Sequence, residues 1–509
     1  MATAQRSDVN EPGSAKFLFY FQALFRQPKL VLALSCGIFL LQSLPLRSFR
    51  WVEDESWYSS TAYTFLKEGR IRNAIFPVRL ESKADTRPIA MPLTLAAEFK
   101  IFGVNPASAR MAEWLCSLAL IAVVLKLGVA VGMPEAGAIA ALLMSVDNTL
   151  FLAARTTRPE ALVAFFGTLS VLFYFLSRSR ESTGLAALCG LFLGMSFNYH
   201  VNGLAIAASI GLLLIGEFGW GVWRQKRTWA IVLVSAATLV PFAIWLSADP
   251  IHWQAFEELY GRGQTVSLAD VVHSEAIRYR DYLGFSNQRL HLFKYGIPLR
   301  LHVIVLFLVS LGVLARKRRN LFWTILALLI PSLVMWTKEV NPSARFFVIV
   351  APYLALAAGA AFSLLERTRD RALLATLCIL VFVTQAAGNL FILTEYRKAD
   401  YPSVTRQLRS VIPPDARVYG AITFFMALHD RVYYSWNRTP FDYAIRNLGV
   451  DYLILNDRVL VEGSGFGKDD WKLVRERANE FVRDHAILAG RVPSRFYGDL
   501  EIYRVTARE

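Results

Sequence analysis

The sequence predicts a polytopic α-helical membrane protein that ends in a small soluble α/β domain. Of the 509 residues, 55% are hydrophobic and the mean hydropathy is +0.38, which exceeds what one water-soluble core holds. Apolar runs of roughly 20 residues, the length of a membrane span, recur along the first three quarters of the chain. After residue 391 the composition changes to mixed charge and ordinary hydrophobicity.

The apolar runs define the expected domains. Residues 1–27 are expected to be a cytoplasmic tail, residues 28–391 a transmembrane domain, and residues 392–509 a soluble extracytoplasmic domain. Two long outer loops, 49–108 and 248–297, interrupt the transmembrane domain. The eleven expected spans are 28–47, 109–130, 134–153, 161–177, 184–199, 203–219, 228–247, 298–315, 321–337, 346–365 and 371–391.

Clusters of Lys and Arg set the expected orientation. They stand between apolar runs, at 224–227 (RQKR), 316–319 (RKRR) and 367–371 (RTRDR). Positive residues resist translocation, so these clusters mark cytoplasmic loops. They also account for much of the net charge of +15, and no nucleic-acid motif accompanies it. We expect a multi-pass protein of a bacterial inner membrane, with its active site facing the extracytoplasmic side.

Two segments of the outer loops are predicted to lie along the membrane surface. Residues 87–105 are apolar but short, and Pro88 and Pro92 break the run, so a helix in the interface is expected rather than a span. Residues 255–295 mix aromatic and charged residues at near-helical spacing. They predict either interfacial helices over a cavity or an ordinary amphipathic connector.

The tail from residue 392 alternates strand-like and helical stretches. Strand-like runs at 416–420, 431–436, 451–456 and 496–505 are separated by helical stretches such as 468–486, a pattern typical of a small α/β domain. The four cysteines all lie within apolar runs of the membrane domain. They predict neither a disulfide framework nor a cysteine metal site.

The acids of the outer face are the first candidate site residues. RWVEDESWYSSTAY, residues 50–63, places Asp54 and Glu55 directly after the first span, and Glu160 leads another span on the same face. Two such carboxylates suit a general base with an orienting partner. Alternatively, Asp54 and Glu160 suit weak ligation of a divalent cation, which the sequence permits but does not demand. A solvated loop acid remains the plain alternative for Asp54 alone.

Cations and aromatic residues on the same face complete the set. Arg87, Arg158 and Arg345 lie on the expected outer face, where positive charge is normally scarce. The arginine guanidinium group binds phosphate through bidentate hydrogen bonds. Snorkelling or pairing with outer acids is the alternative for each. Trp57 and Tyr58 are expected to line a sugar or lipid cleft. His200 is a base, a ligand or a phosphate contact, or a plain hydrogen-bonding residue.

The order of these motifs resembles the GT-C class of membrane glycosyltransferases, in the branch of the protein O-mannosyltransferases and the bacterial lipid A aminoarabinose transferase. The resemblance covers roughly residues 28–365. Its motifs read Asp54-Glu55-Ser56-Trp57-Tyr58, TRPIAMPLTL (86–95), IFGVNPASAR (101–110), Arg155-Thr-Thr-Arg158-Pro159-Glu160, and RFFVIVAPYLALAAG (345–359). The chain departs from the family in having Trp57 where close relatives have a basic residue, Glu160 where an Asp is usual, and one proline after Arg87.

The resemblance implies a GT-C-like fold and inverting transfer of a sugar from a polyprenyl-phosphate donor to an acceptor hydroxyl. It implies that Asp54 takes the proton of the acceptor and that Glu55 or Glu160 orients the acceptor or holds a cation. Arg87, Arg158 and Arg345 would neutralise the departing lipid phosphate. The acceptor is left open as a lipid, a protein or a polysaccharide. A secondary transporter and a non-catalytic membrane scaffold remain the rival functions; the nearly charge-free middles of the spans argue against transport.

Overall fold

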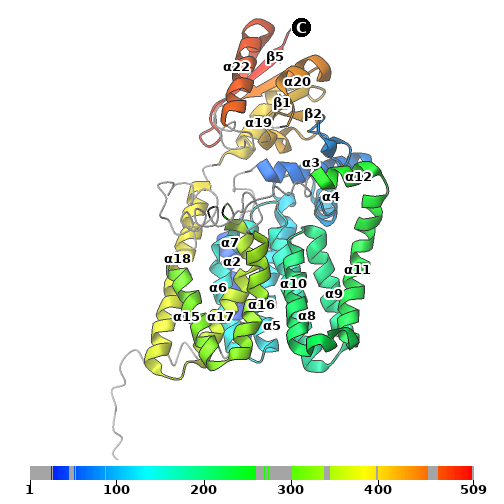
Figure 1. The fold of residues 1–509 in the computed structure, drawn as a ribbon. Coiled ribbons are helices and arrows are strands. Elements are labelled where there is room, and N and C mark those ends of the chain that lie inside the picture. The colour runs from blue at the N-terminus through cyan, green and yellow to red at the C-terminus, as the bar shows by residue number, and fades with distance from the viewer. Residues whose placement is uncertain are drawn as a thin grey trace, which may run out of the picture.

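The eleven predicted spans each overlap a helix of one bundle, seen in the lower part of Figure 1. The structure, a computed structural model, describes residues 27–44, 51–258, 301–336, 344–396 and 399–506 except positions 52, 86, 437 and 457–467, together with Phe25, Ala269 and His273. The bundle helices are α2 (Pro28–Ser43), α5 (Met111–Ala130), α6 (Pro134–Val146), α8 (Glu160–Arg180), α9 (Thr183–Tyr199), α10 (Gly203–Phe218), α11 (Lys226–Ser247), α15 (Leu301–Lys317), α16 (Arg319–Trp336), α17 (Ala351–Leu364) and α18 (Thr368–Tyr396).

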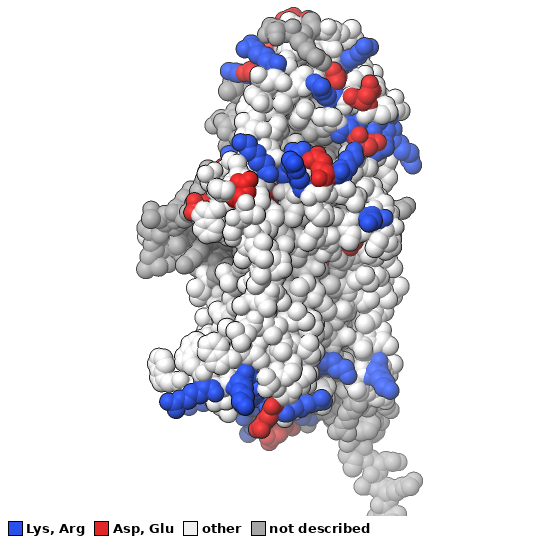
Figure 2. Space-filling view, turned by 90° about the vertical axis from the view of Figure 1, so that its right-hand side faces the viewer, with Lys and Arg blue, Asp and Glu red and all other residues white. Residues whose placement is uncertain are grey.

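Membrane crossing is supported by length and composition for part of this bundle. Within the described residues, five helices are long and apolar enough to span a bilayer. They are Ser108–Ala130, Glu160–Arg180, Gly203–Arg224, Lys226–Ser247 and Thr368–Thr394. Figure 2 shows a white belt without charged residues between two charged ends, as expected for an integral membrane protein. The total of eleven spans stays a prediction.

Small residues let the bundle helices approach closely. A side chain added at Gly190 of α9 would collide with the Ile231 carbonyl oxygen on α11, and one added at Gly359 of α17 would collide with the Ala136 carbonyl oxygen on α6. Such backbone contact replaces hydrophobic burial as the source of packing energy inside a bilayer, where lipid tails are as apolar as leucine.

Short helices cover one end of the bundle. These are α3 (Glu53–Glu68), α4 (Ala90–Phe102) and α12 (Pro250–Phe256), and they lie between the bundle and the sheet domain (Figure 1). α4 corresponds to the predicted interfacial helix, and Gly103, with φ of 79°, ends it. Most of the other predicted surface segment, 255–295, lies outside the described residues.

The predicted C-terminal α/β domain is confirmed as a five-stranded sheet with helices. The strand order is β2-β1-β3-β5-β4, with β1 parallel to β2 and β3, and β5 antiparallel to β3 and β4. Its elements are α19 (Tyr401–Val411), β1 (Arg417–Gly420), β2 (Val432–Ser435), α20 (Phe441–Leu448), β3 (Tyr452–Leu455), α22 (Lys468–His485), β4 (Ala486–Val492) and β5 (Leu500–Val505). β4 was not among the predicted strands.

The sheet domain packs directly on α3 and its flanks. The Trp51 backbone N–H donates to the Tyr497 hydroxyl at 2.9 Å, and the Ser435 N–H donates to the Ile75 carbonyl at 3.0 Å. The ring of Tyr63 lies 5.1 Å from that of His429. The sheet domain therefore packs against α3, the helix that carries the acidic motif.

Candidate functional site

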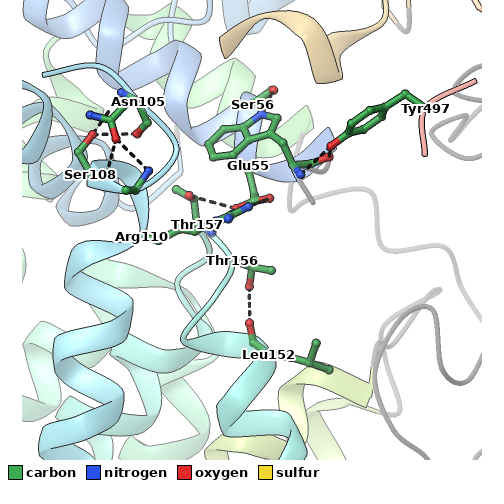
Figure 3. Close-up of polar contacts among 11 residues, drawn as sticks. Glu55, Ser56, Asn105, Ser108, Arg110, Leu152, Thr156, Thr157 and Tyr497 are labelled. Atoms are coloured by element: carbon green, nitrogen blue, oxygen red, sulfur yellow. Dashed lines mark hydrogen bonds and ion pairs between the residues drawn. The ribbon is translucent and has the colours of Figure 1, made fainter. Parts of the chain in front are cut away.

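A buried ion pair fixes the start of the acidic helix. Arg110, at the N-terminus of α5, donates through Nε and Nη2 to the two carboxylate oxygens of Glu55 at 2.7 and 2.9 Å. Both side chains are fully buried. The Thr157 backbone N–H donates to the same carboxylate at 2.9 Å, and Figure 3 shows Arg110 and Thr157 converging on Glu55. Glu55 thus ties three chain segments together and is closed to substrate.

A local turn places Arg110 for this pairing. The Asn105 side-chain oxygen accepts the Ala107 and Ser108 N–H groups at 3.0 and 3.1 Å, and the Ser108 hydroxyl donates to the Gly103 carbonyl. Figure 3 shows Asn105 beside Ser108 in this turn. Asn stabilises such turns by bonding its own backbone two residues on. The motif IFGVNPASAR therefore forms a compact joint between α4 and α5.

Asp54, Arg158 and Glu160 form a second, more open cluster. Arg158 donates through Nη1 to Asp54, and through Nε to the Glu160 carboxylate at 3.0 and 3.2 Å. The Asp54 side chain is 42% exposed, whereas the side chains of Arg158 and Glu160 are 10% and 4% exposed. Burial lowers the pKa of Arg158, but the charges of Asp54 and Glu160 raise that pKa by more. Arg158 is a fixed cation that holds an accessible carboxylate in place.

Aromatic residues and arginines flank this cluster. The Arg87 guanidinium lies 4.1 Å from the Trp57 ring and 5.1 Å from the Tyr58 ring. Arg438, from the sheet domain, lies 5.1 Å from the same Trp57 ring. Cations over aromatic faces are held without losing their charge. Two arginines from distant parts of the chain thus share one aromatic platform beside Asp54.

Tyr58 lies among the charged groups. It is buried, and burial raises the pKa of its hydroxyl, with opposing contributions from the nearby Arg87 and Arg158. The hydroxyl therefore stays protonated at neutral pH and is a hydrogen-bond donor. Behind it, Asp85 accepts the Thr61 hydroxyl at 2.6 Å and pairs with Arg87 at 3.5 Å, which anchors the Arg87 segment to α3.

Other predicted site residues lie elsewhere or are only partly described. His200 ends α9, where its Nδ1 accepts the Asn202 N–H at 3.2 Å and its ring lies 6.2 Å from that of Phe346. Arg345 belongs to the short helix η6 (Ala344–Ile349), and its side chain lies outside the described residues. Arg155 is fully buried and donates to the Ser43 and Gln42 carbonyls at the end of α2.

The predicted cation ligands Asp54 and Glu160 do not fit a divalent ion in this arrangement. Their carboxylates face each other across the Arg158 guanidinium, which bonds to both. Within the described residues, no group of three or more His, Cys, Asp or Glu side chains is placed to hold a metal ion. Arg158 supplies the positive charge between the two carboxylates.

Arg438 is the site residue that the sequence pattern missed. It lies in the soluble tail, and only the fold brings it to Trp57. Its one sequence signal is its place inside the sequon Asn437-Arg438-Thr439, which points to glycosylation and not to phosphate.

Two further buried acids, on α4 and α5, lie near the Glu55–Arg110 pair. Glu98 of α4 accepts the Ala112 N–H at 2.6 Å, while its other oxygen has no hydrogen-bond partner among the described residues. Glu113, fully buried on α5, has no such partner there for either oxygen. Burial raises the pKa of Glu98 to about 8. The acid is therefore protonated in the folded protein at neutral pH.

Glu98→Gln is expected to remove a loss of stability at high pH. The folded pKa lies above the ordinary value of 4.5, so the folded state binds more protons and the free energy of unfolding falls as pH rises from that value through about 8. Gln keeps the oxygen that accepts the Ala112 N–H. In thermal unfolding from pH 5 to 9, the variant should exceed wild type by roughly 2–6 °C at pH 9 and match it near pH 5. If the unfolding temperatures of wild type and Glu98→Gln run parallel across this pH range, or if the exposed Glu68→Gln gives the same gain at pH 9, titration of Glu98 is not the cause of the pH dependence.

Comparison with known proteins gives the fold its context. Residues 86–245 match the family model described as dolichyl-phosphate-mannose-protein mannosyltransferase. The structure of ArnT from Cupriavidus metallidurans bound to undecaprenyl phosphate has a TM-score of 0.68 at 14% identity, over 94% of this chain and 99% of that one. The apo oligosaccharyltransferase of Archaeoglobus fulgidus has a TM-score of 0.56 at 13% identity, over 86% and 71%. No curated protein sequence matches the chain significantly.

Both structural neighbours are GT-C glycosyltransferases. At such low identity the likeness concerns the fold, and the family model covers the segment from residue 86 into the last turn of α11. The resemblance predicted from the sequence is therefore confirmed: the chain has the GT-C fold of membrane glycosyltransferases, and its residues 86–245 match the dolichyl-phosphate-mannose-protein mannosyltransferases.

Proposed function

We propose that the chain is an inverting glycosyltransferase that moves a sugar from a polyprenyl-phosphate donor to an acceptor hydroxyl. The observation that carries the proposal is the partly exposed Asp54 carboxylate, held by Arg158 beside Arg87 and Arg438 at one end of a GT-C bundle. A base and a set of fixed cations are what transfer from a phosphate leaving group needs. The sugar, a hexose or a pentose, reaches the site on its lipid from within the membrane.

The chemistry is a single displacement at the anomeric carbon. The acceptor hydroxyl gives its proton to Asp54 while its oxygen forms the new bond to that carbon. The bond from the carbon to the phosphate oxygen breaks on the opposite face, and the electron pair leaves with the lipid phosphate. Charge therefore builds on the phosphate, where fixed guanidinium groups stabilise it without reorganisation.

Each side chain has a distinct part in this proposal. Arg87, Arg158 and Arg345 neutralise the donor phosphate, and Arg438 joins them from the sheet domain. Trp57 and Tyr58 form the floor on which the sugar or the lipid headgroup rests, and the Tyr58 hydroxyl donates a hydrogen bond. Glu55 is a positioning residue because it is buried against Arg110, and Glu160 orients Arg158. His200 borders the acceptor side through the turn between α9 and α10.

The extracytoplasmic side is the proposed location of this site. In Figure 2 Lys and Arg stand at both ends of the molecule, and an uncharged belt separates those at the end away from the sheet domain from the others. The three basic clusters at 224–227, 316–319 and 367–371 are cytoplasmic by the positive-inside rule, which puts α3, α4 and the sheet domain, residues 392–509, on the outer side. A lipid, a protein or a polysaccharide displayed on that side is the acceptor.

The test is donor consumption by purified protein in lipid vesicles. A panel of radiolabelled polyprenyl-phosphate sugars is offered with membrane, protein and polysaccharide acceptor extracts. Consumption of one donor with sugar appearing on an acceptor supports the proposal. Movement of the intact donor across the bilayer without transfer would overturn it in favour of transport, and donor binding without either process would favour a scaffold.

Arg438→Gln is expected to raise the KM for the donor roughly 10- to 150-fold, because one charge-assisted contact to phosphate, about 1.5–3 kcal/mol, is lost. Turnover at saturating donor should change by less than about threefold, since Asp54 and Arg158 are untouched. Arg406→Gln, at an exposed position on α19 of the same domain, is the matched control. Equal KM values in the two variants would remove Arg438 from the donor site.

A further inference from the structure

A cavity opens at the far end of the bundle from the acidic cluster. Its volume is about 580 Å³, and it is lined by the last turns of α5 and α8 and the first turn of α16. α8 begins at Glu160 and ends at Arg180, which at 1.5 Å per residue makes it about 30 Å long. The cavity therefore lies one hydrocarbon thickness away from the acidic cluster and is separate from it.

Three arginines line this cavity. They are Arg178 at the end of α8, and Arg318 and Arg319 at the start of α16. Arg178 lies 3.8 Å from Glu217, but that carboxylate is already bound by Arg227 at 2.9 Å and by the Tyr174 hydroxyl at 2.7 Å. No carboxylate of the described chain pairs with Arg318 or Arg319. The cavity is therefore lined by an excess of positive charge.

Part of the cavity wall is apolar, and the rest of it is polar. Phe175, Val131 and Leu321 line it beside the arginines. The side chains of Trp323 and Trp229, on α16 and α11, are exposed around this end of the bundle. Exposed tryptophans mark the level of lipid headgroups. A ligand here meets guanidinium groups at one end and hydrocarbon at the other.

We propose that this cavity binds the phosphate of an anionic phospholipid from the cytoplasmic leaflet. Arginine forks match phosphate oxygens, and basic pockets between membrane helices on the cytoplasmic side take anionic headgroups. The apolar wall accommodates the first carbons of the acyl chains, which free phosphate lacks. The positive-inside rule alone requires basic residues at this end but not a cavity that gathers three of them. The site is independent of sugar transfer.

The test compares two variants with the same loss of charge. Delipidated full-length protein in detergent is titrated with fluorescent phosphatidylglycerol and, separately, phosphatidylcholine. Arg318→Gln/Arg319→Gln removes two arginines of the cavity. Arg367→Gln/Arg369→Gln removes two exposed arginines of another cytoplasmic cluster, outside the cavity lining. We expect wild type to prefer phosphatidylglycerol, the cavity variant to bind it at least tenfold more weakly, and the control variant to stay within about twofold.

Other outcomes overturn the proposal. If phosphatidylglycerol binding weakens equally in both variants, it depends on the overall positive charge of the surface and not on the cavity. Equal affinity for the two lipids would mean that the protein has no site selective for anionic lipid. Displacement of phosphatidylglycerol by millimolar inorganic phosphate at constant ionic strength, but not by chloride, would make it a free-phosphate site. If the cavity variant does not fold, Arg178→Gln, which changes the opposite wall, should weaken phosphatidylglycerol binding in the same direction.

Discussion

Asp54→Asn is expected to lower the rate of sugar transfer by about 10²–10⁴-fold, the usual contribution of a positioned general base. Asparagine has the same shape, and its side-chain oxygen still accepts a hydrogen bond from Arg158, so the local structure is kept. What is lost is the ability to take the proton of the acceptor hydroxyl. Single-turnover transfer from the donor that wild type consumes is the measurement.

Donor binding should survive this substitution. Arg158 keeps its hydrogen bonds to Glu160, and removal of the Asp54 charge leaves more net positive charge for the lipid phosphate. The expected signature is therefore a large fall in kcat with an unchanged or lower KM. Glu68→Gln, an exposed acid on the same helix that pairs with Arg72, is the control and should retain wild-type transfer. Wild-type activity in Asp54→Asn would show that the base is another group.

The sequence predicted the helical bundle and the pair of acids at one end of it because those signals are local. Apolar runs, proline breaks and basic clusters each act within about 20 residues, and the helices and the C-terminal sheet follow them closely. β4 was missed because its segment AILAGRV follows the long helix α22 without a turn signal. It forms a strand because β5 offers an antiparallel edge, which is a long-range condition.

Which of the two neighbouring acids is exposed could not be predicted either, because that difference also depends on contacts between residues far apart in the sequence. Asp54 and Glu55 are neighbours with the same chemistry, yet one is partly exposed and the other fully buried. The difference depends on Arg110 and Thr157, which are 55 and 102 residues away from Glu55. Arg438 likewise reaches Trp57 only because the sheet domain packs on α3. Pairs of residues so far apart in the chain are brought together by the fold, and they produce no recognisable spacing pattern in the sequence.

Arg110→Gln is expected to destabilise the protein more than any surface substitution, by about 3–5 kcal/mol, because it leaves the Glu55 carboxylate buried without its counter-charge. The Thr157 N–H remains as a partner but does not neutralise that charge. Since Glu55 ties α3 to α5 and to the turn before α8, the loss should also displace Asp54 and lower transfer. Thermal unfolding and transfer activity in the same preparation measure both effects.

A double variant separates charge from shape. Glu55→Gln/Arg110→Gln removes both charges and keeps two groups that can hydrogen-bond, so it should recover part of the stability that Arg110→Gln loses, since the cost lies mainly in the uncompensated buried charge. Arg72→Gln is the matched control because Arg72, in the segment after α3, pairs at 2.7 Å with Glu68, the last residue of that helix, with side chains 28% and 41% exposed. Its cost should be about 0–1 kcal/mol. If Arg110→Gln costs no more than Arg72→Gln, water reaches Glu55 and the pair does not fix α3. If the double variant is less stable than the single one, the two side chains act through packing, and the position of Asp54 depends on their shape instead of their charge.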